Sequence, residues 1–262
     1  MTLARADLES LLRDRKLDRT LTKAYPPFDP NDEYAIAPTG VSVLDARLGG
    51  GFPRGQLSEL VGPRSSGRTS LLLEMLAAAT SRGELVALVD ALDMFDAASA
   101  SAAEIDLDRL LWIRGHVVTS PGMCRDRNQR ALEQAVKALT LVLQAGNFGV
   151  VVLDVAEAPM DAVRRLPFTT WLRLQRIIEG SQTACVLVGA EPMARSSAGL
   201  TLRVGIRGLG LGTRGGVRDL GLGIRFSGRL FDGLDVEACV VRARSSVLQE
   251  TTVAFAAASH HA

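Results

Sequence analysis

The chain contains little cysteine, histidine and lysine, and these shortages exclude several classes of protein. Its three cysteines, Cys124, Cys185 and Cys239, are spaced too widely for a disulfide framework or a cysteine-rich zinc site. Three histidines are too few to predict a histidine-centred metal site. No apolar run reaches the roughly 18 residues that span a bilayer, and the segment Met1–Lys16 is too charged for a signal peptide. We therefore expect a cytoplasmic protein with no membrane partner.

The positive charge of the chain comes almost wholly from arginine. Among the 262 residues, 30 are Lys or Arg and 29 are Asp or Glu, which gives a net charge of +1. Only Lys16, Lys23 and Lys137 are lysines. The balance excludes a histone-like or acidic-tail protein but allows a local basic face. Hydrophobic residues make up 47% of the chain, enough for a full core in one large domain or two small ones.

Three regions of the chain differ in their local pattern. Residues 1–38 combine a predicted amphipathic helix over 3–23 with a proline-rich linker. Residues 39–256 are the predicted core, and residues 257–262 a flexible tail. In the core, apolar strands alternate with helices, which predicts an α/β fold with a mostly parallel sheet flanked by helices. After Gly199 the pattern alternates with a period of two, which predicts antiparallel strands at the C-terminal end.

A loop rich in glycine and serine is the clearest chemical signal. It joins the predicted strand 57–61 to the predicted helix 69–81. Its residues are Gly62, Pro63, Arg64, Ser65, Ser66, Gly67, Arg68, Thr69 and Ser70. Such a loop binds phosphate because its backbone N–H groups and the helix N-terminus face the anion. The sequence therefore predicts a nucleotide-binding loop in which the hydroxyl of Thr69 or Ser70 orients Mg²⁺.

Position 68 departs from the phosphate-loop pattern G-x-x-x-x-G-K-[ST], because Arg68 stands where the pattern has lysine. A guanidinium is planar and forked, so it cannot make the contacts of a compact ammonium in the same crevice. Backbone contacts to ATP can survive this change, whereas phosphoryl transfer depends on positioning and charge and should suffer. The alternative is a vestigial loop that binds nothing.

An aspartate at the end of an apolar strand supports the loop prediction. Asp154 follows the strand 149–153. This is the usual place of a carboxylate that orients Mg²⁺ through water. The alternative is an aspartate that only caps the following turn.

Taken with the residues before it, the loop resembles the RecA recombinase family. The resemblance implies a RecA-like fold with ATP and Mg²⁺ as cofactors, and it covers roughly residues 39–244. The stretches that carry it are TGVSVLD (39–45), LGGGFPRG (48–55), ELVGP (59–63), SSG (65–67), VDA (89–91) and VVLD (151–154).

Two departures from the RecA pattern affect nucleotide chemistry. The resemblance places a catalytic glutamate where this chain has Leu92, and an aliphatic side chain cannot activate water. Neither Asp90 nor Asp93, which flank it, is clearly placed to replace the glutamate. The resemblance also places an Asn-Gln sensor where this chain has Gly189 and Ala190. These departures argue against efficient ATP hydrolysis.

A RecA-like core with altered nucleotide chemistry resembles the ImuA-type accessory proteins of bacterial mutasomes. This resemblance implies a role in DNA repair, within SOS-induced translesion synthesis. The implied partners are an ImuB-like homologue of Y-family polymerases, an error-prone polymerase, RecA and DNA. The alternative function is that of an ATP-dependent, DNA-binding, recombinase-like ATPase. It is favoured by the parts of the phosphate-loop pattern that are intact, which are Gly62, Gly67, Thr69 and Asp154.

An arginine- and glycine-rich segment over residues 203–229 is the candidate DNA contact. It holds a single acidic residue, Asp219, against six arginines. These are Arg203, Arg207, Arg214, Arg218, Arg225 and Arg229. The glycines between them predict a hairpin, and guanidinium forks suit the geometry of DNA phosphates. A solvated hairpin and a protein-docking edge are the alternatives.

Overall fold

The computed structural model describes residues 36–115, 125–206, 224–227, 230–243 and 252–258. All of them lie in one compact unit, Glu33–Ala262. The predicted helix over 3–23, most of the arginine- and glycine-rich segment and the tail from 259 onward lie outside the described residues.

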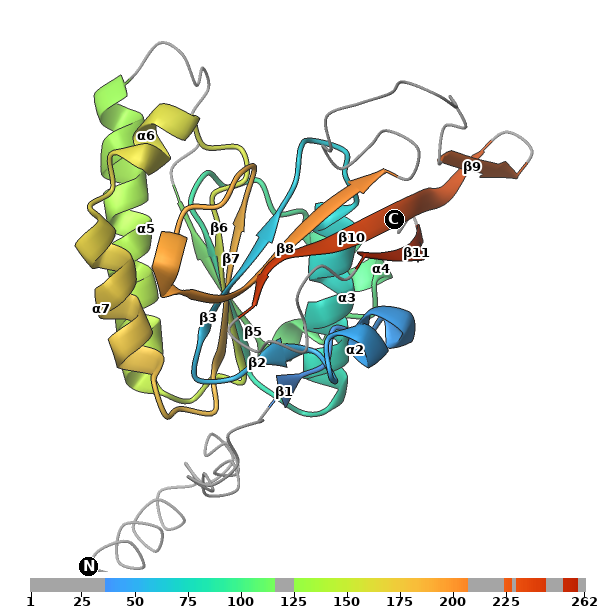
Figure 1. The fold of residues 1–262 in the computed structure, drawn as a ribbon, viewed down its shortest axis with the longest axis horizontal. Coiled ribbons are helices and arrows are strands. Elements are labelled where there is room, and N and C mark those ends of the chain that lie inside the picture. The colour runs from blue at the N-terminus through green and yellow to red at the C-terminus, as the bar shows by residue number, and fades with distance from the viewer. Residues whose placement is uncertain (1–35, 116–124, 207–223, 228–229, 244–251, 259–262) are drawn as a thin grey trace, which may run out of the picture. The chain divides into compact units, whose positions relative to one another are not determined.

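A central sheet of nine strands organises the described part of the chain (Figure 1). Its order is β11-β10-β8-β3-β7-β6-β4-β5, and β9 pairs with β10. Six strands run parallel: β3 (Leu57–Val61), β4 (Val86–Asp90), β5 (Leu110–Arg114), β6 (Val150–Asp154), β7 (Ala184–Gly189) and β8 (Ala198–Ile206). Three pair antiparallel: β9 (Ile224–Ser227), β10 (Leu230–Ala243) and β11 (Thr252–Ala258). The predicted fold class is confirmed.

The direction of β8 differs from the sequence-based expectation. This strand pairs in parallel with β3 on one side and antiparallel with β10 on the other. The antiparallel part of the sheet therefore begins at β10 and not at Gly199. A period of two identifies a strand whose faces differ, but it does not give the direction of its neighbours.

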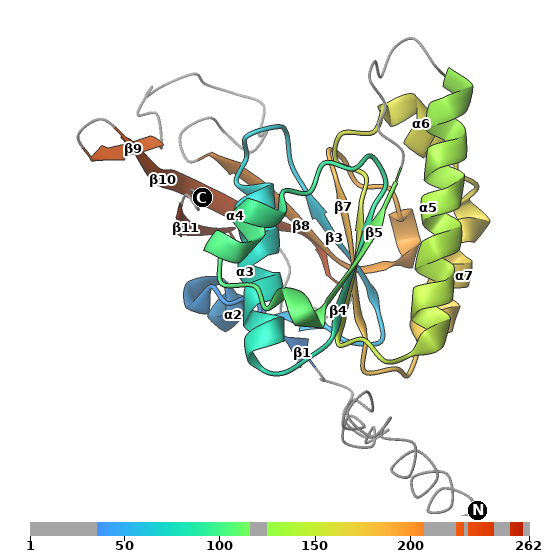
Figure 2. The ribbon, with the colours of Figure 1, turned by 180° about the vertical axis from the view of Figure 1, so that it is seen from behind.

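Helices cover both faces of the sheet (Figures 1 and 2). On one face lie α2 (Ser42–Arg47), α3 (Arg68–Ser81) and α4 (Ala97–Ala102). On the other lie α5 (Arg125–Ala145), α6 (Met160–Arg164) and α7 (Phe168–Ile178). Short 3₁₀ turns, η2 (Leu107–Arg109) and η3 (Arg195–Ser197), precede β5 and β8. None of the helices in the described residues is long and apolar enough to cross a membrane.

The parallel strands are apolar throughout because they bury both faces. In β6, Val150 and Val152 join the core on the α3 side, whereas Val151 and Leu153 join the core on the α5 and α7 side. Each such side chain stabilises the fold by roughly 1.5–3 kcal/mol when fully buried. Because successive side chains point to opposite faces and both faces are buried, a wholly apolar run indicates a strand that is covered by helices on both sides.

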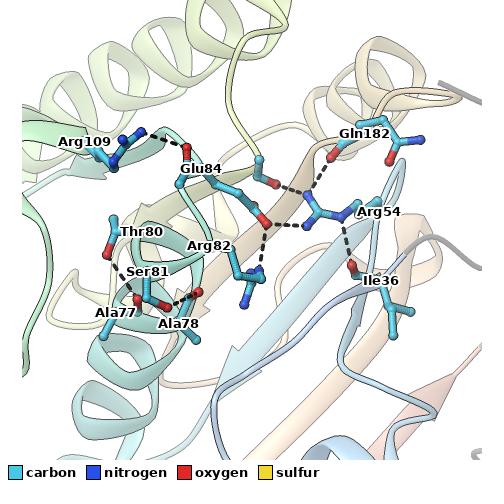
Figure 3. A network of polar contacts seen from close by, with 12 residues as sticks. Ile36, Arg54, Ala77, Ala78, Thr80, Ser81, Arg82, Glu84, Arg109 and Gln182 are labelled. Carbon is cyan, nitrogen blue, oxygen red and sulfur yellow. Dashed lines mark hydrogen bonds and ion pairs between the residues drawn. The ribbon is translucent and has the colours of Figure 1, made fainter. Parts of the chain in front are cut away.

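The amino ends of the parallel strands are held by one buried arginine (Figure 3). Arg54 donates hydrogen bonds to the carbonyls of Gly149, just before β6, and Gln182, just before β7. It also forms an ion pair with Glu84, at 2.9 Å, just before β4. Its Nε donates to the carbonyl of Ile36 in β1 (Ile36–Ala37), which pairs with β2 (Phe52–Pro53). Residues that the sequence assigns to the linker thus pack on the core.

Candidate nucleotide-binding site

The carboxyl ends of four neighbouring strands bring the predicted site residues to one edge of the sheet. The loop follows Val61 at the end of β3, and Gly189 pairs with Val61 at the end of β7. Asp90 ends β4 and pairs with Asp154, which ends β6. Ligands of open α/β sheets bind at this edge. The topology therefore places the predicted loop and the predicted Mg²⁺-orienting aspartate together.

The loop leads into a helix N-terminus that is suited to an anion. Ser65 and Gly67 adopt left-handed conformations, with φ values of 59° and 86°. Helix α3 begins at Arg68, and no side chain caps its N-terminus. Its first N–H groups are thus available to an anion. Gly67 also requires glycine for space, because a Cβ there would lie 2.4 Å from Val236 Cγ2 on β10.

A cleft of about 390 Å³ opens beside the loop. Thr69, which is exposed, and Asp154 both line this cleft. A hydroxyl and a carboxylate are oxygen donors that suit Mg²⁺, so these two residues would hold the cation. No cluster of three or more His, Cys, Asp or Glu suited to a metal occurs among the described residues. The remaining residues of the cleft are Arg64, Arg68, Ser70, Leu72, Leu73, Met94, Phe95, Asp96, Ser99, Ala156 and Glu157.

Arg68 does not take the position that a loop lysine needs. Its Nη1 donates hydrogen bonds to the carbonyls of Gly62 and Gly189, the latter at 2.9 Å, so the guanidinium joins the ends of β3 and β7. Its side chain is only 5% exposed. Burial lowers the pKa of Arg68, against the opposing attraction of Asp154 and Glu157. The guanidinium therefore stabilises the loop by binding these two carbonyls. Its planar, forked shape suits this role better than that of a compact ammonium.

Glu157 is a site residue that the sequence analysis missed. Its carboxylate lies 2.6 Å from the guanidinium of Arg64 and 3.6 Å from that of Arg68. No motif marks this position. The signal available in the sequence was a charged residue three positions after Asp154, on the connection that leaves the same strand end.

Asp154 combines the two arrangements proposed for it from the sequence. It lines the cleft, and its Oδ1 accepts a hydrogen bond from Ala156 N at 2.8 Å, which caps the turn after β6. Burial raises the pKa of Asp154 to about 6, and the nearby carboxylate of Asp90 adds to the increase. A bound cation would favour the charged form and lower this pKa.

The position of the expected catalytic glutamate faces away from the cleft. Leu92 is 6% exposed and packs in the core on the α5 and α7 side. Asp90 accepts hydrogen bonds from Phe95 N and from the indole of Trp112. Asp93 forms two hydrogen bonds, of 2.7 and 2.8 Å, with the guanidinium of Arg114. Both flanking carboxylates have structural partners, and neither lines the cleft.

The predicted DNA-contacting arginines are described only in part. Arg203 on β8 pairs with Glu191 at 2.8 Å and is not among the residues that line the cleft. Arg225 lies on β9, where only the backbone is described. The other four, Arg207, Arg214, Arg218 and Arg229, lie outside the described residues.

Comparison with curated proteins finds many RecA relatives. The RecA of Streptomyces avermitilis is 35% identical over 126 residues, which cover 48% of this chain and 30% of that protein. The RecA of Methylococcus capsulatus is 39% identical over 120 residues, 45% of this chain and 30% of the relative. The RecA of Salinispora tropica is 35% identical over 153 residues, which cover 54% of this chain and 40% of that protein. The chain thus matches less than half the length of these relatives.

A solved structure and a family match agree with these relatives. The crystal structure of the RadB recombinase superposes with a TM-score of 0.54 at 19% identity, covering 84% of this chain and 96% of that one. This similarity shows the fold. The RecA N-terminal domain matches residues 29–162, about half of the chain, including the loop, Leu92 and Asp154. The chain therefore belongs to the RecA N-terminal domain family.

Proposed function

We propose that this protein is a RecA-like accessory factor that works as a scaffold in damage-induced translesion synthesis, and not as an efficient ATPase. The observation that carries the proposal is the position of Arg68. Its guanidinium is bound to the carbonyls of Gly62 and Gly189, so it does not present a mobile charge to a nucleotide phosphate. With Leu92 in the core, the cleft also lacks a carboxylate at the position of the family's catalytic glutamate.

ATP with Mg²⁺ is the ligand that the remaining parts of the cleft fit best. The N–H groups of the loop and of the first turn of α3 would face the phosphates. Thr69 and Asp154 would hold Mg²⁺, which would supply positive charge beside the phosphates. We expect weak binding without useful turnover, since the contacts that position the terminal phosphate are those altered at position 68.

The partners of this proposal follow from the resemblance to ImuA-type proteins. We propose that the protein binds an ImuB-like homologue of Y-family polymerases in the cytoplasm, with an error-prone polymerase, RecA and DNA as further partners. A scaffold needs a stable fold and a specific surface but no catalytic cycle, which is consistent with an altered loop on a complete RecA-like sheet.

A recombinase-like ATPase is the second candidate function. It is favoured by the cleft itself, because Thr69 and Asp154 line it as a cation site requires. The family membership is equally consistent with this activity.

Titration and turnover measurements with ATP and Mg²⁺ on the natural protein and on Arg68→Lys separate the two functions. For the natural protein we expect no turnover above background. For Arg68→Lys we expect about ten-fold tighter binding, because a flexible ammonium can reach phosphates that the bound guanidinium does not. Tight binding with turnover by the natural protein would establish the ATPase.

The scaffold role is tested by size-exclusion chromatography with an ImuB-like polymerase homologue. We expect a complex that forms equally well with and without ATP. A complex that forms only with ATP would favour the ATPase, and absence of any complex would overturn the scaffold proposal.

A further inference from the structure

The carboxylate of Glu157 contacts both arginines of the loop. Its Oε2 lies 2.6 Å from Nη2 of Arg64, and its Oε1 lies 3.6 Å from Nη2 of Arg68. All three side chains line the same cleft, together with Thr69 at the start of α3. An internal anion therefore already occupies the arginines at the place where the loop would receive a phosphate.

Carboxylate and phosphate compete for the same guanidinium groups. Both accept paired hydrogen bonds in the plane of an arginine fork. Nε of Arg68 is buried and has no hydrogen-bond partner among the described residues, while its Nη1 is used by two carbonyls. A phosphate that approaches Arg68 or Arg64 must take the place of the Glu157 carboxylate at the guanidinium groups. The displaced carboxylate then stays close to the phosphate and repels it. Asp154 lines the same cleft and adds a second carboxylate to it.

We propose that Glu157 is a specificity-determining residue that disfavours triphosphates in this cleft by acting as an internal anion for Arg64 and Arg68. Specificity of this kind rests on a repulsive group as much as on attractive ones. The inference deepens the proposed function and rests on it, since it gives a further reason why the altered loop should bind ATP only weakly.

The ion pair of Glu157 with Arg64 contributes little to folding, which makes Glu157 suitable for testing. Arg64 is 80% exposed, and a pair with such an exposed partner stabilises a protein by no more than about 1 kcal/mol. The contact with the buried Arg68 is longer, at 3.6 Å, and Arg68 keeps its two carbonyl acceptors when Glu157 is replaced. Glu157→Gln keeps the shape of the side chain and removes its charge. We therefore expect a folded variant whose melting temperature stays within a few degrees of that of the natural protein.

Calorimetric titration with two probes tests the proposal. Glu157→Gln should bind ATP in the presence of Mg²⁺ about ten-fold tighter than the natural protein, because one negative charge beside the phosphates is gone. Adenosine, which has no phosphate, should bind both proteins equally. Asp161→Asn, which removes an exposed carboxylate on α6, is the matched control and should behave as the natural protein.

Two results would overturn the proposal. One is an ATP affinity of Glu157→Gln within two-fold of the natural protein, or no measurable binding by either. The other is an equal gain for adenosine, which would show a change in the shape of the cleft and not in its charge. Neither result depends on turnover, so the inference can fail while the proposed function stands, and turnover by the natural protein would overturn the proposed function instead.

A double-variant cycle adds a second test. If Glu157 acts through the arginines, the gain in ATP affinity from Glu157→Gln should shrink several-fold in an Arg64→Ala background. An undiminished gain would contradict the pairing and overturn the proposal.

Discussion

At the scale of single residues, the site is governed by charges that are partly removed from water. Asp154 lies near two acidic groups, Asp90 and Glu157, and near the guanidinium of Arg68. Burial outweighs the attraction of the arginine, so the carboxyl group holds its proton more tightly than in water and its pKa rises to about 6. In the absence of a cation, the charged form of Asp154 is therefore a cost to the fold.

That cost predicts a pH-dependent effect of Asp154→Asn. The pKa of Asp154 is raised from 3.8 to about 6 on folding. Its stabilising contribution is thus complete below pH 3.8 and is lost as the pH rises through 6. We expect Asp154→Asn to increase the free energy of unfolding above pH 6, by at most about 3 kcal/mol, and to change it little near pH 4. Urea unfolding at both pH values measures this difference.

The control for this prediction is Asp161→Asn, since Asp161 is an exposed aspartate on α6. It should give the same change in the free energy of unfolding at both pH values. An Asp154→Asn effect that is equal at pH 4 and pH 8 would contradict a raised pKa.

Residue identities could be predicted from the sequence where a motif fixes them. The pattern from Gly62 to Ser70 places a loop, and Asp154 at a strand end places a carboxylate beside it. The pairing of Glu157 with Arg64 could not be predicted, because it depends on how the connection after β6 folds back toward the loop. The direction of the Arg68 side chain was equally hidden, since its acceptors include a carbonyl 121 positions away.

At the scale of elements, a buried carboxylate fixes the strands that carry the loop. Glu59, in the middle of β3, is 1% exposed. Its Oε1 accepts hydrogen bonds from the backbone N–H groups of Met193 and Ala194, at 2.6 and 2.7 Å. Its Oε2 accepts one from the hydroxyl of Thr201 on β8, at 2.6 Å. One side chain thus binds β3 to the connection after β7 and to β8.

Removing these acceptors should destabilise the protein strongly. Glu59→Leu leaves two buried backbone N–H groups without partners, which predicts a loss of about 3 kcal/mol or more in the free energy of unfolding. Glu59→Gln keeps one acceptor oxygen for both N–H groups, and its amide can donate to Thr201. We expect it to lose about 1 kcal/mol or less. Chemical denaturation of both variants measures the difference, and equal losses would show that packing alone decides this position.

Elements were more predictable than their pairing. The bounds expected for the strand 57–61 match β3, because a short apolar run between turn residues is a local signal. The direction of β8 is a non-local property that depends on the path of the chain after η3. It could not be predicted from alternation alone.

At the scale of the whole molecule, a net charge of +1 gives no general attraction to DNA. Any affinity must come from a local concentration of arginine. The structure reduces the contribution expected from Arg203, because Glu191 already neutralises its guanidinium at 2.8 Å. Arg214 and Arg218, near the middle of the segment, remain the stronger candidates for DNA contact.

This difference predicts unequal salt dependence. Replacing Arg214 and Arg218 together by alanine should reduce the slope of log affinity for DNA against log salt by about 2, since each phosphate contact contributes about 0.9. Arg203→Ala should change the slope by much less. Fluorescence anisotropy with labelled DNA across a range of salt concentrations measures the slopes. An unchanged slope in the double variant would remove DNA contact from the predicted role of this segment.

The close approach of Gly67 to β10 has a mechanical consequence. The last glycine of the loop lies against Val236 so tightly that no methyl group fits between them. β10 also pairs with β8 and β9, which carry the two ends of the arginine- and glycine-rich segment. A shift of β10 toward the loop would therefore bring Val236 against the turn that starts α3. The position of β10 and the conformation of the loop are thus coupled sterically at Gly67, whether or not a nucleotide is bound.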